Sequence, residues 1–179
     1  MAAIALAVPD QHIKRIESPI GRIELLSDGA VLTSLAIERD RGLPHDALSE
    51  VTDRVLDTAA GQLEEYFDGR RSEFDLPVAL HGTQFQVRVW TLLATLPFGV
   101  TTSYAKLAEH LGKPGAARAI GGAVGANPVP IIVPCHRVLG HDGAITGYSA
   151  GAGIPTKQWL LGREGVSIGP AGAAVPTPA

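Results

Sequence analysis

Short apolar runs in the first forty residues predict a small antiparallel sheet. Three runs rich in Ile, Leu and Val, at 13–17, 22–26 and 31–37, are separated by Ser18-Pro19-Ile20-Gly21 and by Asp28-Gly29. Pro-Gly and Asp-Gly signals between β-rich segments are typical of turns. We therefore predict a meander of about three strands.

Residues 46–66 change to helical spacing. Apolar side chains recur there every three or four positions, at Leu48, Val51, Val55, Leu56, Ala59, Leu63 and Phe67. This pattern predicts one helix whose apolar face covers the sheet. We expect residues 1–76 to form a compact α/β domain, followed by a linker at 77–82.

The chain after the linker is predicted to form a helical domain over 83–166. Thr83 and Gln86 make a capping box at the start of an apolar stripe, and Trp90 is expected in the core. A last helix is expected from 155 to 164. The whole chain is thus a mixed α/β (α+β) protein, with a sheet-plus-helix domain followed by a helical one.

Two short helices in this second domain have the lengths, the capping residues and the turn that are typical of a helix-turn-helix. Thr102-Ser103 can cap a helix over 104–111, and Gly112-Lys113-Pro114 separates it from a helix over 115–124. The second helix has Arg118 as its only charged side chain, among small residues. Such a helix either packs tightly against another helix or faces DNA. A lone Arg amid small residues can penetrate a groove, which favours DNA.

Charge differs between the two regions. The net charge is only −3, but residues 1–82 carry 8 Lys and Arg against 15 Asp and Glu, whereas residues 83–179 carry 7 against 3. An acidic part that scaffolds and a basic part that meets a polyanion would explain this asymmetry. Chance surface composition is the alternative.

The two ends of the chain add expectations about location and order. Residues 1–8 are apolar, but they lack a basic region and are too short for a membrane span or an export signal. We therefore expect a cytoplasmic protein that contacts no membrane and keeps its thiol reduced. Residues 167–179 are mostly Gly, Ala, Pro and Thr, with little to bury, and we expect a disordered tail.

Cys135 is the only cysteine of the chain. A single thiol excludes an internal disulfide and any multi-cysteine metal site, so we expect no bound metal. It is then either a small buried hydrophobe or a nucleophile. An apolar run and Pro134 precede it, and His136 and Arg137 follow it. These neighbours could lower its pKa and raise the thiolate fraction.

Several motifs in one order resemble the O6-alkylguanine-DNA alkyltransferases, which repair O6-alkylguanine in DNA. The resemblance covers about 16–166, and its motifs are Gly82-Thr83-Gln84-Phe85-Gln86, Val89-Trp90, Pro97-Phe98-Gly99, Thr102-Ser103-Tyr104, Ala116-Ala117-Arg118-Ala119-Ile120-Gly121, Asn127-Pro128, Pro134-Cys135-His136-Arg137-Val138, Gly147-Tyr148 and Lys157-Gln158-Trp159-Leu160-Leu161 with Glu164. It implies an RNase H-like N-terminal domain and direct alkyl transfer from O6-alkylguanine, or from O4-alkylthymine, to the protein.

The resemblance also implies roles for four catalytic residues. Cys135 would accept the alkyl group, and His136 would take its proton through a bound water. Glu164 would orient and charge-balance that histidine, and Asn127 would brace the turn that carries the cysteine. An alkyl-cysteine is a thioether without an easy exit, so each molecule should act once, and no cofactor is needed.

The implied partner is double-stranded DNA, bound through its minor groove by a monomer. Tyr104 would contact the flipped guanine, and Arg118 would fill the gap that it leaves. The remaining implied contacts are a close-approach face at Ala116, Ala117 and Gly121, and pocket walls at Val138, Tyr148 and Ser149.

Other readings fit the sequence less well. A zinc nucleic-acid deaminase requires a second cysteine, and a cysteine hydrolase would not need the Arg118 helix. A non-enzymatic lesion-binding relative has Trp at the acceptor position. One departure from the family pattern stands out, because the segment 148–157 is about two residues longer.

Overall fold

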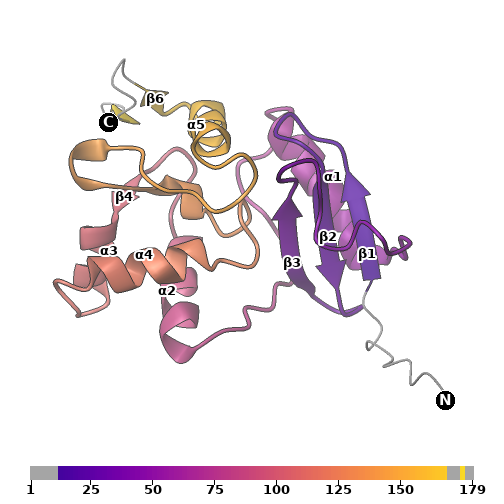
Figure 1. Cartoon of the computed structure of the whole chain (residues 1–179), viewed down its shortest axis with the longest axis horizontal. Coiled ribbons are helices and arrows are strands. Elements are labelled where there is room, and N and C mark those ends of the chain that lie inside the picture. The colour runs from indigo at the N-terminus through magenta and orange to yellow at the C-terminus, as the bar shows by residue number, and fades with distance from the viewer. Residues whose placement is uncertain (1–11, 169–173, 176–179) are drawn as a thin grey trace.

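The N-terminal domain is a three-stranded antiparallel sheet with one helix on it (Figure 1). This computed structural model describes residues 12–168 and 174–175. The strands β1 (His12–Ile16), β2 (Ile23–Ser27) and β3 (Leu32–Ile37) run in sequence order, and α1 spans Arg54–Phe67. All five residues of β2 are buried, because it is the central strand under the helix. The predicted meander is confirmed.

The predicted start of the helix at residue 46 is wrong, because α1 begins at Arg54. The side chain of Asp53 caps it by accepting a hydrogen bond from the Leu56 amide. The preceding residues form turns instead, and Val51 pairs with Ile13 through two backbone hydrogen bonds of 2.9 and 3.1 Å. Leu48 and Val51, which continued the apolar periodicity, are exposed.

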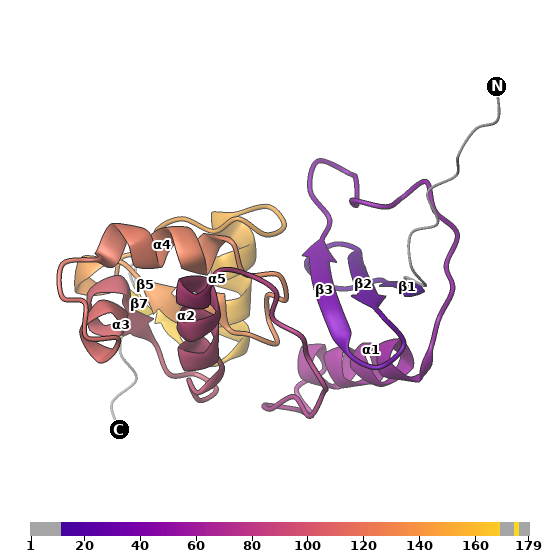
Figure 2. The same cartoon turned by 90° about the horizontal axis from the view of Figure 1, so that it is seen from below.

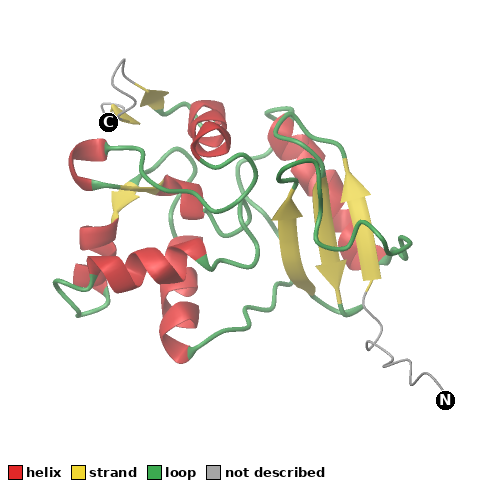
Figure 3. Cartoon of the chain, in the orientation of Figure 1, coloured by secondary structure: helices red, strands yellow, loops and turns green. Residues whose placement is uncertain are grey.

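The C-terminal domain is mostly helical (Figure 3). Its helices are α2 (Gln84–Ala94), α3 (Tyr104–His110), α4 (Ala117–Gly125) and α5 (Ile154–Arg163). The capping box of Thr83 and Gln86 is formed, and the Ser103 side chain caps α3. Trp90 is buried, as expected. Short 3-10 turns lie at Cys135–Arg137 and His141–Gly143, and β4 (Thr102–Ser103) pairs in parallel with β5 (Val138–Leu139).

The two domains share one hydrophobic core. Strand β3 is the strand nearest to the C-terminal domain (Figure 2), and its Leu35 amide donates to the Pro128 carbonyl across the boundary at 2.9 Å. The linker is also tied to the sheet, because Leu32 exchanges backbone hydrogen bonds with Pro77 and Ala79. One continuous cluster of buried side chains therefore includes residues of both domains.

The tail differs in part from the predicted disorder. Strands β6 (Ser167–Ile168) and β7 (Ala174–Val175) pair in an antiparallel arrangement, since backbone pairing does not require large side chains. The rest of the predicted tail, 169–173 and 176–179, lies outside the described residues. Among the described residues, no helix is long and apolar enough to cross a membrane.

Candidate active site

The segment before Cys135 is a braced turn. The Asn127 side chain donates to the Val133 carbonyl at 2.7 Å and accepts from the Val129 amide at 3.1 Å. Within this turn the buried Ile131 has a φ of 76°, a value that a β-branched residue adopts only when its surroundings impose it. The two hydrogen bonds of Asn127 therefore brace the turn that precedes the cysteine.

Cys135 lies at the wall of a cavity of about 320 Å³. It begins the 3-10 turn Cys135–Arg137 and is 5% exposed. Of the predicted residues, Tyr104, Gly121, Tyr148 and Ser149 line the same cavity, together with Val124, Gly125 and Gly147. Side chains from α3, α4 and the loop before α5 thus meet at the only thiol of the chain.

Not every predicted substrate or DNA contact lines that cavity. Val138 is fully buried, pairs with Thr102 between β5 and β4, and offers its carbonyl to Lys157. Arg118, Ala116 and Ala117 lie at the start of α4, away from the cavity lining. Arg118 is exposed, whereas Ala116 and Ala117 are half-buried.

His136 and Glu164 form a buried pair. His136 Nε2 lies 2.8 Å from Glu164 Oε1, and both side chains are fully buried. His136 Nδ1 has no hydrogen-bond partner among the described residues. The imidazole is therefore anchored by one ring nitrogen, and its other nitrogen is free to handle a proton.

Glu164 accepts more hydrogen bonds than the sequence suggested. Arg137 donates to both of its carboxylate oxygens, at 2.7 and 2.8 Å, and the Gly99 amide donates to Oε2 at 3.1 Å. Tyr66 of α1 donates to Oε1 at 3.0 Å. Sequence reasoning missed these three donors; Arg137 and Gly99 lie in the quoted motifs, but nothing in the sequence indicated Tyr66.

Gly99 explains the motif Pro97-Phe98-Gly99. Its φ is 73°, and a Cβ atom there would lie 2.8 Å from the Glu164 carbonyl oxygen. A side chain would therefore push this turn away from Glu164 and weaken the amide hydrogen bond.

The pKa values describe a resting site with a neutral base and a protonated thiol. Burial lowers the pKa of His136, and Glu164 only partly opposes this effect. Burial acts to raise the pKa of Glu164, but the hydrogen bonds from His136 and Arg137 outweigh it and hold the pKa well below its ordinary value. Glu164 is therefore a carboxylate at neutral pH.

Burial also raises the pKa of Cys135, so the expectation that its neighbours lower this pKa needs correction. The Asn127 amide, the Tyr148 hydroxyl and the Lys157 ammonium act in the opposite direction. The cation that favours the thiolate is thus Lys157, whereas Arg137 is paired with Glu164. A base is needed to take the proton when the thiol reacts.

Lys157 ties the pocket loop to the domain. It is fully buried and donates to the carbonyls of Val138 at 2.5 Å and Thr146 at 2.9 Å. Burial lowers its pKa to about 8. Its ammonium therefore holds the start of the loop that carries Tyr148 and Ser149, and sequence reasoning had assigned it no such part.

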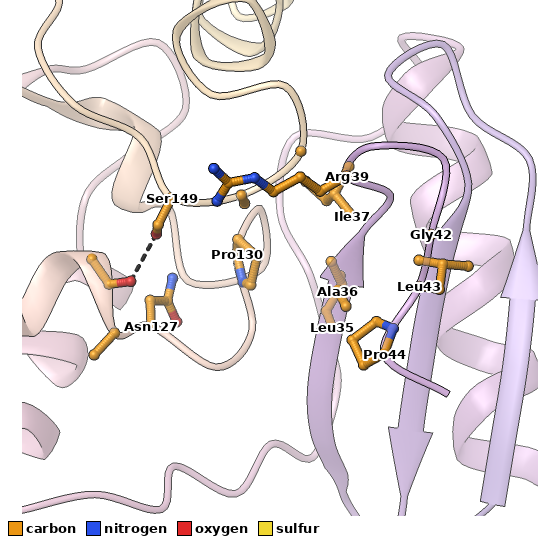
Figure 4. A pocket seen from close by; sticks show the side chains of 14 residues that line it. Leu35, Ala36, Ile37, Arg39, Gly42, Leu43, Pro44, Asn127, Pro130 and Ser149 are labelled. Carbon is orange, nitrogen blue, oxygen red and sulfur yellow. Dashed lines mark hydrogen bonds between the residues drawn. The ribbon is translucent and has the colours of Figure 1, made fainter. Parts of the chain in front are cut away.

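A second hollow, of about 480 Å³, adjoins the cysteine cavity between the two domains (Figure 4). Ser149 lines both, and its hydroxyl donates to the Gly125 carbonyl at 2.7 Å. The longer loop reaches the N-terminal domain here, because a Cβ on Gly151 would lie 3.0 Å from Ile37. Arg39 extends from the N-terminal domain toward Ser149 (Figure 4).

No metal centre is formed in the described part of the chain, where no three His, Cys, Asp or Glu side chains are grouped to hold an ion.

Comparison with known proteins covers both domains. Residues 12–80 match the family description "6-O-methylguanine DNA methyltransferase, ribonuclease-like domain", and residues 84–166 match "6-O-methylguanine DNA methyltransferase, DNA binding domain". The methylated-DNA–protein-cysteine methyltransferase of Mycobacterium tuberculosis is 46% identical over 153 residues, which are 86% of this chain and 92% of the relative.

Solved structures agree with this likeness. The crystal structure of the Mycobacterium tuberculosis O6-methylguanine methyltransferase aligns with a TM-score of 0.77 at 45% identity, over 86% of this chain and 92% of that one. The Mycobacterium tuberculosis protein in complex with DNA aligns over the same shares, with a TM-score of 0.76 and 46% identity. An O6-methylguanine DNA methyltransferase from Methanococcus jannaschii aligns over 88% of this chain and 95% of that one, with a TM-score of 0.62 and 27% identity.

Proposed function

The chain belongs to the 6-O-methylguanine DNA methyltransferase family, and from this premise we propose how its own residues carry out the reaction. It is a methylated-DNA–protein-cysteine methyltransferase, which repairs DNA by moving an alkyl group from the damaged base to a cysteine. Cys135 is the acceptor, because it is the only cysteine and lies at the wall of the cavity.

The transfer is a substitution at the alkyl carbon. His136 takes the thiol proton, directly or through a water, and Glu164 stabilises the resulting imidazolium. The sulfur forms a bond to the alkyl carbon while the bond from carbon to O6 breaks, and the electron pair of that bond leaves with guanine. The guanine anion takes up one proton, equal to the one that the thiol lost, and remains in the DNA as unmodified guanine. Nucleophile and electrophile supply all the electrons, so the step needs no cofactor.

The product thioether makes the protein single-use. A thioester would hydrolyse in water, but the carbon–sulfur bond of alkyl-cysteine offers no comparable route back to the thiol. One molecule therefore repairs one lesion, and the same chemistry applies to O6-alkylguanine and to O4-alkylthymine.

The base must leave the duplex to reach Cys135, because the sulfur is buried. We assign Tyr104 and Tyr148 to the flipped base, since both line the cavity. Arg118, exposed at the start of α4, would enter the duplex from the minor groove and occupy the place of the base. Contacts of this kind offset an unstacking cost of a few kcal/mol. One copy of the chain contains all of these groups, so we propose that the protein acts as a monomer. The reaction needs a reduced thiol, which the cytoplasm maintains.

The observation that carries this proposal is the single thiol at the wall of a cavity, directly followed in sequence by His136, which forms a buried pair with Glu164. The test is to incubate the protein with duplex DNA containing one O6-methylguanine and to measure its intact mass. We expect the mass of one added methyl group, located on Cys135. Cys135→Ala should still bind the duplex but gain no mass; methyl transfer by that variant would refute the assignment.

A further inference from the structure

Tyr66 brings a buried hydroxyl of the N-terminal domain into contact with Glu164. It lies near the end of α1, 98 residues before Glu164, and its side chain has no exposed surface. Its hydroxyl lies 3.0 Å from Glu164 Oε1, the same oxygen that lies 2.8 Å from His136 Nε2. The N-terminal domain thus contacts the carboxylate that holds the proposed base.

The position of this hydroxyl is fixed from several sides. The Tyr66 ring packs against Phe67 and Phe74 at centroid distances of 5.5 Å and against Phe98 at 6.2 Å. Arg163 of α5 donates to the Tyr66 carbonyl at 2.6 Å and to the Phe67 carbonyl at 3.1 Å. These contacts join the end of α1 to the end of α5, so the hydroxyl has little freedom to turn away.

The protonation states define the direction of the hydrogen bond. Burial raises the pKa of Tyr66, and the charge of Glu164 adds to this effect. Tyr66 is therefore a neutral phenol that donates to an ionised carboxylate.

Charged and titratable groups from the 3-10 turn, from α5 and from the loop before α5 surround the pair of Tyr66 and Glu164. Arg137 of the 3-10 turn contacts both oxygens of Glu164, and Arg163 of α5 lies over the Tyr66 ring at 5.7 Å. The charge of Lys157 of α5 lowers the pKa of His136. Burial raises the pKa of Tyr148, and electrostatic interactions with Tyr66 and Glu164 add to this effect. Among the described residues, the group within hydrogen-bond distance of the His136 side chain is Glu164.

We propose that Tyr66 is a positioning residue for alkyl transfer: its hydroxyl holds Glu164 Oε1 toward His136 and limits how strongly that imidazole binds its proton. This inference rests on the proposed role of His136 as the base. Oε1 accepts hydrogen bonds from Tyr66, His136 and Arg137 at the same time. Each donor weakens the hold of the oxygen on the others, so loss of the hydroxyl should strengthen its attraction for an imidazolium.

The prediction has a defined sign. The rate of transfer should fall at acidic pH as His136 becomes protonated, because a protonated imidazole cannot accept the thiol proton. In Tyr66→Phe the pKa of His136 should rise, so this acidic limb should move to higher pH. The plateau rate should change by less than about fivefold, since one neutral donor is lost and the aromatic ring remains.

The experiment is a single-turnover measurement of methyl transfer from O6-methylguanine duplex across a range of pH. It compares the unsubstituted protein with Tyr66→Phe and with 3-fluorotyrosine incorporated at position 66. The fluorinated phenol is a stronger donor of the same shape, so its acidic limb should move to lower pH. A titration of His136 by nuclear magnetic resonance should show the same two opposite shifts.

Phe67→Leu is the matched control. It disturbs the same aromatic cluster and the stability of α1 without touching Glu164, so its acidic limb should stay in place. A purely structural role for Tyr66 would make Tyr66→Phe behave like Phe67→Leu, and that result would overturn the inference.

Glu164→Gln separates this inference from the proposed function. If its pH dependence changes while both Tyr66 substitutions leave the limb unmoved, the His136–Glu164 mechanism stands and the inference about Tyr66 is wrong. If Glu164→Gln also leaves the pH dependence unchanged, the pair does not act as the base, and both proposals fail.

Discussion

Replacing Glu164 with Gln removes one charge from the centre of a buried network without changing the size of the side chain. The carboxylate accepts from His136, twice from Arg137, from the Gly99 amide and from Tyr66. Gln has the same shape but only one acceptor oxygen, and its NH₂ group must face donors on the other side. The substitution also leaves Arg137 without its counter-charge, with its side chain only 6% exposed.

These losses give two separate magnitudes. Removing one partner of a buried ion pair costs about 3–5 kcal/mol of stability. In a chain of this size each kcal/mol lowers the melting temperature by about 2–4 °C, so we expect a decrease of roughly 10 °C. A hydrogen bond to a charged group contributes about 1.5–3 kcal/mol. If the imidazolium that forms during transfer loses this stabilisation of about 1.5–3 kcal/mol, transfer slows by roughly 10- to 150-fold.

The assay is single-turnover transfer of a labelled methyl group from duplex O6-methylguanine, at a temperature well below unfolding of the variant. The acidic limb of the rate should move to lower pH, because Glu164 no longer raises the pKa of His136. Glu64→Gln is the control, since Glu64 is exposed on α1 and its substitution should change neither rate nor melting temperature.

A double variant separates stability from chemistry. Glu164→Gln combined with Arg137→Met leaves no unpaired buried guanidinium, so it should regain part of the lost stability without regaining the rate. A Glu164→Gln protein that reacts within about threefold of the parent, with the same pH dependence, would refute the role of the carboxylate. A decrease in melting temperature of less than about 2 °C would show that the buried pair of Glu164 and Arg137 does not stabilise the fold as reasoned above.

Three further predictions test other parts of the site. Arg118→Ala should slow reaction with duplex DNA far more than reaction with free O6-benzylguanine, because its proposed work is to hold the duplex open; equal losses would indicate a structural arginine. Asn127→Ala should lower the free energy of unfolding in urea by about 1.5–4.5 kcal/mol, since it leaves the Val129 amide unpaired and removes one of the two donors to the Val133 carbonyl, which still accepts from the Cys135 amide; a loss below about 1 kcal/mol would contradict the bracing role. Stability should fall as pH decreases below about 6.5, because unfolded chains protonate His136 there while the folded pKa is lower. His136→Gln should reduce this slope between about pH 7.5 and 5.5, and an equal slope in both proteins would exclude His136 as its source.

Local interactions made much of the fold predictable from the sequence. The three strands, the capping box at Thr83 and the cap at Ser103 depend on residues within a few positions of each other, and the structure forms them all. The start of α1 was not predictable from periodicity, because Leu48 and Val51 continue the apolar spacing. Val51 instead pairs with Ile13, nearly forty residues away, so the chain directly before Asp53 is not helical and the helix begins only after Asp53.

The sequence also contained the chemistry of the site but not its full environment. A single cysteine followed by a histidine, in motifs that resemble a known family, indicated Cys135, His136, Asn127 and Glu164 without coordinates. Only the tertiary structure showed that burial raises the pKa of the thiol and that Lys157 is the cation acting against it. It also placed Tyr66 of the first domain on Glu164 at the end of α5. A hydrogen bond between residues 98 positions apart follows from how two domains pack, and no spacing along the chain encodes it.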